Sequence, residues 1–204
     1  MRKRHAAWMA AAALVGVLSA GQAAQATTLG SYTFEDNAFA DVVLGYGGNW
    51  QLVGAPDIQT AVVGNNVSDY IWTFDGNAWA DIGFTDNRLR NGSGNDLAVF
   101  EISGYGWPGA TGCTVRLTIN GVTQTRTPVW DFSNVYVALF DLDQFGVPAG
   151  GLVSSFTARG VSGGDPEYAA FGALNNAAVP LPASIWLLGA GCAGLAGLAR
   201  RRDR

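Results

Sequence analysis

The chain has 204 residues, of which 49% are hydrophobic and 14% charged, and this composition excludes charge-driven disorder, which requires few apolar residues and a large net charge. Its net charge of −4 is unevenly spread, because residues 1–26 and 179–204 each carry +3, whereas residues 27–178 hold five arginines and fifteen acidic residues and carry −10. An acidic middle repels phosphate, so the composition argues against nucleic-acid binding.

Missing residue types narrow the chemistry open to the chain. The only histidine is His5 and the only lysine is Lys3, and both lie in a segment that we expect to be removed. The remaining domain then has no imidazole base for a serine or cysteine nucleophile and no lysine for a Schiff base. Two cysteines are also too few for a cysteine-only zinc site. Carboxylate chemistry and metal binding through oxygen ligands remain open.

The N-terminus has the pattern of a secretory signal peptide over residues 1–26. Basic residues run from Arg2 to Arg4, an apolar stretch follows from Ala6 to Leu18, and Ala24 and Ala26 supply the small residues that a signal peptidase accepts. We expect cleavage after Ala26. The alternative is an uncleaved membrane helix, which the short apolar stretch disfavours.

Residues 27–178 carry the pattern of one all-β domain. Helical periodicity is absent, and short alternating runs are separated by Gly, Asn, Asp and Pro. We expect a single jelly-roll-like β-sandwich, flanked by the N-terminal signal peptide and a C-terminal transmembrane helix. The nine expected strands are Ser31–Phe34, Ile71–Phe74, Ala78–Thr85, Leu97–Ile102, Cys113–Ile119, Val122–Thr127, Val135–Leu142, Leu152–Ala158 and Tyr168–Ala173.

The clearest local prediction is a β-hairpin at residues 113–127. Apolar residues alternate with Thr and Arg from Cys113 to Ile119, Asn120-Gly121 follows, and Pro128 comes after the return strand. Asn-Gly between two alternating runs is a strong signal for a two-residue type I′ turn. Proline then stops the second strand, because it cannot donate to the sheet.

Three features follow one another in residues 179–204. They are the segment Val179-Pro180-Leu181-Pro182-Ala183, an apolar run from Ser184 to Ala199, and the cluster Arg200-Arg201-Arg202. At about 1.5 Å per residue a helix over 183–199 spans about 25 Å, slightly less than a hydrocarbon core of about 30 Å. We expect a weak transmembrane helix with its arginines on the cytoplasmic side.

This order of features resembles the PEP-CTERM sorting signal in its Val-Pro-Leu-Pro-Ala variant. The resemblance implies processing by an exosortase, in addition to signal peptidase, and cleavage near the proline motif. It implies transient anchoring in the inner membrane of a Gram-negative bacterium, then export to the cell surface or exopolysaccharide matrix. Leu181 stands where the commonest form of the motif has Glu. A plain tail anchor is the alternative, and a Gram-positive sortase signal fits poorly because Ser184-Ile185 replaces the required Thr-Gly.

Short segments of the middle also resemble β-sandwich ectodomains of PEP-CTERM proteins and the discoidin-like, galactose-binding jelly roll. They are Asp36–Asp41, Ile82–Asp86, Gly94–Glu101 and Asp165–Tyr168. The resemblance implies a structural Ca²⁺ that joins an early loop to the last strand, with Asp36, Asp41 and Glu167 as ligands. Calcium is the one cofactor that these patterns suggest.

A second loop, from Asp86 to Asp96, is also rich in acids and amides but lacks EF-hand spacing. For both loops the alternative is that Asn, Asp and Gly serve turn geometry, because they tolerate positive φ and bond to their own backbone.

Carbohydrate binding is suggested by the aromatic content. Tyr105 and Trp107 lie in the Gly- and Pro-containing segment Gly104–Gly109, which is typical of a loop tip that displays aromatic rings. Sugar faces stack on such rings. The alternative is that these aromatic residues fill the core or cover a sheet.

We expect no catalytic residues. Glycoside hydrolysis needs two carboxylates at a fixed separation, and Glu35, Glu101 and Glu167 do not form a recognisable pair in the sequence. Alternation places Glu101 on the side of Leu97 and Val99, so we expect it to be partly buried. Cys113 is expected to be an inert buried thiol, with an oxidised dimer as the alternative, because Cys192 lies in the expected tail helix.

Taken together, these patterns predict a non-enzymatic, exported protein with a structural or adhesive role at the surface or in the extracellular matrix. Its expected partners are signal peptidase, an exosortase, the membrane and exopolysaccharide. The alternative function is a calcium-supported, lectin-like carbohydrate-binding module.

Overall fold

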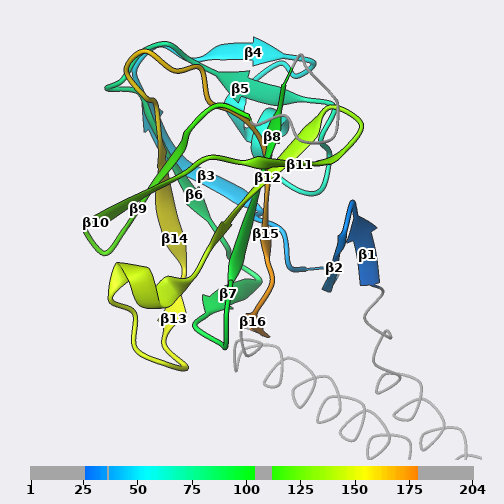
Figure 1. Cartoon of the computed structure of the whole chain (residues 1–204), viewed down its shortest axis with the longest axis vertical. Coiled ribbons are helices and arrows are strands. Elements are labelled where there is room, and N and C mark those ends of the chain that lie inside the picture. Colours follow the sequence, from blue (N-terminus) through cyan, green and yellow to red (C-terminus); the bar gives the residue numbers. More distant parts are fainter. Residues whose placement is uncertain (1–25, 36, 104–111, 179–204) are drawn as a thin grey trace, which may run out of the picture.

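The computed structural model describes residues 26–35, 37–103 and 112–178, which form antiparallel sheets with little helix. The expected all-β class is therefore confirmed. Figure 1 shows the strands of the two larger sheets crossing the body of the domain. One has the order β10-β9-β14-β6-β3 and contains β3 (Val42–Gly47), β6 (Trp79–Gly83), β9 (Val115–Ile119), β10 (Val122–Arg126) and β14 (Ser155–Arg159).

The second large sheet has the order β11-β12-β8-β15-β5-β4. Its strands are β4 (Gln51–Val53), β5 (Tyr70–Trp72), β8 (Leu97–Ile102), β11 (Val129–Phe132), β12 (Val135–Phe140) and β15 (Glu167–Ala173). Two small sheets and two short helices complete the described fold. One small sheet pairs β1 (Ala26–Leu29) with β2 (Tyr32–Glu35), and the other has the order β13 (Leu152–Val153), β7 (Asn87–Arg90) and β16 (Asn176–Ala178). The helices are α2 (Ile58–Val62) and the 3₁₀ helix η1 (Leu142–Phe145).

The core lies between the two large sheets. The rings of Phe156 on β14 and Phe171 on β15 are 5.1 Å apart, edge to face. Tyr168 of β15 is fully buried, and its hydroxyl donates to the backbone carbonyl of Arg159 at 2.8 Å and accepts from the backbone amide of Arg116 at 3.1 Å, both on the opposite sheet. Apolar packing and these hydrogen bonds therefore join the two sheets as a sandwich.

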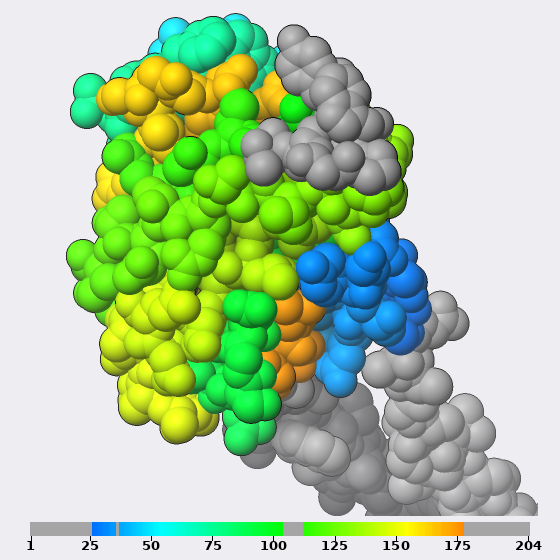
Figure 2. All heavy atoms as spheres, in the orientation of Figure 1, coloured from blue at the N-terminus to red at the C-terminus, as the bar shows by residue number. Residues whose placement is uncertain are grey.

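The opposite face of the six-stranded sheet is covered in part by the β1–β2 hairpin. Phe34 of β2 and Phe100 of β8 have ring centroids 5.8 Å apart. A Cβ at Gly172 would come within 2.5 Å of the Phe34 ring, so glycine allows the hairpin to approach β15. Figure 2 shows this hairpin, in blue, lying against the body of the domain.

The predicted hairpin at residues 113–127 is confirmed, although β9 begins at Val115 and β10 ends at Arg126. Asn120 and Gly121 have φ angles of 50° and 79°, the two positive values that a type I′ turn requires. The predicted strand Leu97–Ile102 has the same bounds as β8.

Several expectations about strands were wrong. The single strand predicted over 152–158 is two strands, because β13 pairs with β7 whereas β14 pairs with β6. Ser154 lies between them, and its carbonyl accepts a hydrogen bond from the Phe84 amide. The strands β1, β3, β4, β7, β11 and β16 and the five-residue helix α2, capped by the Asp57 side chain, were not predicted at all.

Among the described residues, no helix is long and apolar enough to cross a membrane. The predicted transmembrane helix 183–199 and residues 1–25 of the predicted signal peptide lie outside the described ranges.

Candidate functional site

A groove of about 580 Å³ opens at one end of the six-stranded sheet. Tyr70 and Glu167 are the first residues of β5 and β15, and Ile102 is the last residue of β8. Because β15 is antiparallel to β8, Glu167 and Ile102 meet at one end of the sheet. Glu167 is paired with Trp72 of β5, and Tyr70 lies two residues along β5 from that position, on the same face. The groove is lined by Val67, Ser68, Tyr70, Ile102, Ser103, Phe132, Ser133, Asn134, Val135 and Glu167.

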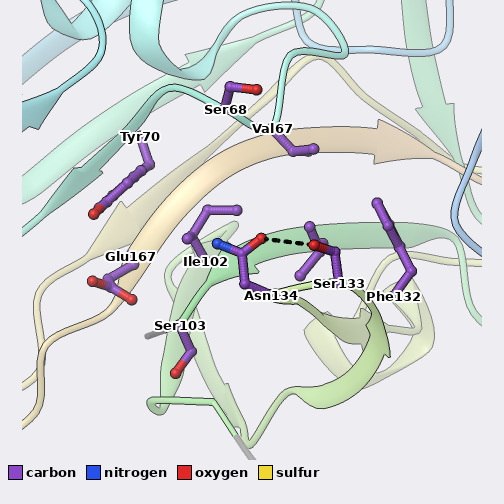
Figure 3. Close-up of a pocket in the computed structure, with 10 residues that line it drawn as sticks. Val67, Ser68, Tyr70, Ile102, Ser103, Phe132, Ser133, Asn134 and Glu167 are labelled. Carbon is purple, nitrogen blue, oxygen red and sulfur yellow. Dashed lines mark hydrogen bonds between the residues drawn. The ribbon is translucent and has the colours of Figure 1, made fainter. Parts of the chain in front are cut away.

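Figure 3 shows Tyr70 and Glu167 on one side of the groove and Phe132 and Ser133 on the other. Burial raises the pKa of Glu167 to about 7, and repulsion from Asp165 adds to the shift. Burial and the negative charge of Glu167 likewise raise the pKa of Tyr70. The groove therefore offers a carboxyl group that exchanges its proton near neutral pH, beside a phenol that stays protonated.

Glu101 lies behind Glu167 and faces the core. It has no exposed surface, and its Oε1 lies 3.5 Å from the Glu167 amide, at the limit of a hydrogen bond. Its Oε2 is buried without a partner among the described residues. Burial raises the pKa of Glu101 to about 9, against the lowering effect of the Glu167 amide hydrogen bond and with a smaller rise from the negative charge of Glu167, so this side chain is protonated at neutral pH. The expectation of partial burial understated the observed burial.

Gly112 allows this arrangement, because a Cβ at that position would lie 1.8 Å from Glu101 Oε2. Cys113 follows and is a free, half-buried thiol beside Asp165 Oδ1. Burial and the hydrogen bond to Asp165 raise the pKa of Cys113 to about 12. A thiol that stays protonated is a poor nucleophile.

The two glutamates do not face a common space. Glu167 lines the groove, whereas Glu101 is fully enclosed. A hydrolytic carboxyl pair must flank one substrate bond. In this conformation the arrangement suits ligand binding through Tyr70, Asn134 and Glu167 better than acid–base catalysis by the pair.

The structure separates the two described members of the predicted calcium set. Asp41 accepts hydrogen bonds from Thr85 N and Oγ1 and from Asp86 N, at 2.7–3.1 Å. Burial opposes ionisation of Asp41, but these hydrogen bonds outweigh it and lower the pKa of Asp41. The neighbouring amide, of Ala40, donates to the carbonyl of Phe171 on β15. Phe171 lies four residues along β15 from Glu167, which corresponds to about 13 Å between the two positions.

Asp36 lies outside the described residues, so the calcium prediction stays open at that position. Within the described ranges, no three His, Cys, Asp or Glu side chains are grouped so that they could hold a metal ion.

In the second predicted loop, the Asp96 carboxylate accepts hydrogen bonds from protein donors, two of them backbone amides. It is fully buried; Oδ1 accepts from Gly92 N and Asn175 Nδ2 at 2.8 Å, and Oδ2 accepts from Leu142 N at 2.9 Å. Three protein donors thus occupy the carboxylate, which favours the turn-geometry interpretation of this loop.

The other predicted site residues lie outside the described ranges. They are the aromatic pair Tyr105 and Trp107, Ala24 of the signal-peptide cleavage site, and the sorting-signal residues Val179–Ala183 and Arg200–Arg202. Ala26, the other residue of the cleavage site, is described and begins β1. Sequence reasoning missed the roles of Tyr70 and Asn134. Nothing in their local patterns marks them, because the groove forms only when β5, β12 and β15 are brought together.

No protein-family model matches this chain, and no curated protein matches it. Any assignment of function therefore depends on the residues themselves.

Proposed function

We propose that this chain is an exported surface or extracellular-matrix protein with a structural or adhesive role, sorted by an exosortase. The observation that carries the proposal is the order of proline motif, apolar run and arginine cluster in residues 179–204. Each part has a physical role: a cleavable segment, a marginal membrane helix, and positive charges that orient the helix.

The fold supports this division of the chain. Among the described residues, every strand lies between Ala26 and Ala178, and β16 ends immediately before Val179. Cleavage near the proline motif would therefore leave both large sheets intact. Cleavage after Ala26 would remove only the first residue of β1. The exported part would be the jelly-roll-like β-sandwich, with a net charge of −10 over residues 27–178.

The test is to follow variants of the full chain in a host that carries an exosortase. The wild type should reach the extracellular or surface fraction. Pro180→Ala combined with Pro182→Ala, and Arg200→Gln, Arg201→Gln and Arg202→Gln together, should each leave most of the protein in the inner membrane. Arg90→Gln, a change at an exposed arginine of the domain, is the matched control. Unchanged export of both tail variants would contradict the proposal.

The alternative function is a calcium-supported, lectin-like module, and the groove is the observation that favours it. Its aromatic, hydroxyl, amide and carboxyl side chains are the groups that bind sugars. A lectin should bind a glycan saturably and lose affinity when calcium is removed or when Tyr105→Ala and Trp107→Ala are combined. Calorimetric titration that detects no calcium binding would remove the calcium component.

A further inference from the structure

A second hollow, of about 310 Å³, lies on the outer face of the five-stranded sheet. It is lined by Trp79 and Asp81 of β6 and by their cross-strand partners Arg159 and Thr157 of β14. The residues that alternate with these four, Ala80, Ile82, Phe156 and Ala158, are buried in the core. The four lining side chains therefore point away from the core.

The indole of Trp79 lies across the edge strand β3. A Cβ at Gly47 would come within 2.6 Å of Trp79 Nε1, and one at Gly45 would lie 3.6 Å from the ring. Only glycine at position 47 leaves room for the ring. The backbone of Trp79 is also held, because Trp50 Nε1 donates to its carbonyl at 3.1 Å. The result is a flat aromatic surface beside the hollow, fixed before any ligand arrives.

The polar groups of the hollow are fixed too. Thr157 Oγ1 donates to Asp81 Oδ1 at 2.6 Å. Arg159 Nε donates to Thr118 Oγ1 at 2.9 Å. Within the described ranges the two terminal nitrogens of Arg159 have no partner, so a planar fork of N–H donors remains for a ligand.

The charge of this face differs from that of the whole domain. On this face the five-stranded sheet has Arg116 and Arg159 and a single acidic residue, Asp81, in a domain that carries −10. Arg116 and Arg159 stand directly opposite each other in β9 and β14. Among the described residues neither forms an ion pair, and like charges in such a pair destabilise a sheet. An anion bound between them would relieve that repulsion.

We infer that this outer face binds an acidic polysaccharide, a chain of sugar rings that carry carboxylates. One sugar ring stacks on Trp79, because the apolar face of a sugar matches the face of an indole. The sugar carboxylate pairs with the terminal nitrogens of Arg159, since a guanidinium fork matches a carboxylate bidentately. Arg116, whose Nη2 donates to the Gly76 carbonyl, adds positive charge beside it. Asp81 and Thr157 bond to sugar hydroxyls. The inference is independent of tail processing and of the groove at Glu167.

The test is calorimetric titration of the purified full-length chain with polygalacturonate, with neutral dextran as the comparison polymer. The wild type should bind polygalacturonate saturably, more weakly as salt rises, and should bind dextran at least tenfold more weakly. Trp79→Ala and Arg159→Gln should each weaken polygalacturonate binding at least tenfold.

Two matched controls should bind like the wild type: Phe74→Ala, at an aromatic residue that is 66% exposed, and Arg90→Gln. Each variant is first checked for an unchanged melting temperature. If Trp79→Ala fails that check, Arg159→Gln decides, because within the described ranges the guanidinium of Arg159 makes one hydrogen bond, from Nε to Thr118 Oγ1, and its terminal nitrogens make none. No saturable binding, equal binding of dextran, or full affinity in Arg159→Gln would overturn the inference.

Discussion

Glu101 links burial to pH dependence. Its pKa of about 9 in the fold lies above the ordinary value of 4.5, so the folded state holds a proton that the unfolded state releases between these values. Stability from this group is complete below pH 4.5 and falls as pH rises toward 9, by up to about 1.4 kcal/mol per pH unit. Glu167 adds a loss of the same sign between 4.5 and about 7.

Glu101→Gln should therefore stabilise the protein more at pH 8 than at pH 5, because glutamine stays neutral in the same enclosed position. Chemical denaturation of wild type and variant at both pH values measures the difference in the free energy of unfolding. Comparing the two chains cancels the titration of all other groups. Equal differences at pH 5 and pH 8 would show that Glu101 does not carry this pH dependence.

Asp96 gives a prediction about structure rather than metal. Asp96 is fully buried, and replacing it with Ala removes the hydrogen-bond acceptor of three donors, Gly92 N, Leu142 N and Asn175 Nδ2. Unsatisfied buried donors cost about 1–3 kcal/mol each, so Asp96→Ala should lower the free energy of unfolding by about 3 kcal/mol or more. Glu35→Ala, at an exposed position, should change it little. A wild-type melting temperature that rises with calcium and no longer does so in Asp96→Ala would favour a metal site instead.

At the level of single elements, the β9–β10 turn is held by its two positive φ angles. Gly121 has a φ of 79°, which an L-residue with a Cβ adopts only at a cost. No atom lies within 4 Å of where its Cβ would be, so the backbone alone decides the effect. Gly121→Ala should lower the free energy of unfolding by about 1 kcal/mol.

Thermal or chemical unfolding measures that change. Asn120→Gly is the companion variant and should be nearly neutral, because glycine also accepts the φ of 50° at that position. A neutral Gly121→Ala would mean that the turn has another conformation.

Local patterns predicted the elements that depend on local rules. The alternation and Asn-Gly turn of residues 113–127 and the apolar run of β8 are such cases. The division of 152–158 was not predictable, because β13 and β14 differ only in which distant strand each one pairs with. Short edge strands such as β4 have three residues, too few to show a period of two.

The candidate sites were harder to predict for the same reason. Trp79 and Arg159 are 80 positions apart and become neighbours only through the register of β6 and β14. The sequence showed that Glu101 shares a side with Leu97 and Val99, but not that the described fold encloses it completely. The resemblance that implied Asp41 and Glu167 as partners gave no register, and the structure places them at different ends of β15.

For the whole molecule, the sandwich separates two kinds of surface. One is the groove at the end of the six-stranded sheet, with a carboxyl group that titrates near neutral pH. The other is the outer face of the five-stranded sheet, where positive charge gathers on an acidic domain. The proposed processing would leave both surfaces in place, because all strands of the described residues lie between Ala26 and Ala178.

The central claim is that the chain is processed at both ends and exported. Mass-spectrometric mapping of the mature termini, in membrane and extracellular fractions of a native-type host, tests it most directly. The account predicts an exported chain that begins at Thr27 and ends within Val179–Ala183, with or without added mass at its C-terminus. A chain that retains Arg204 in the membrane, with none outside the cell, would contradict it.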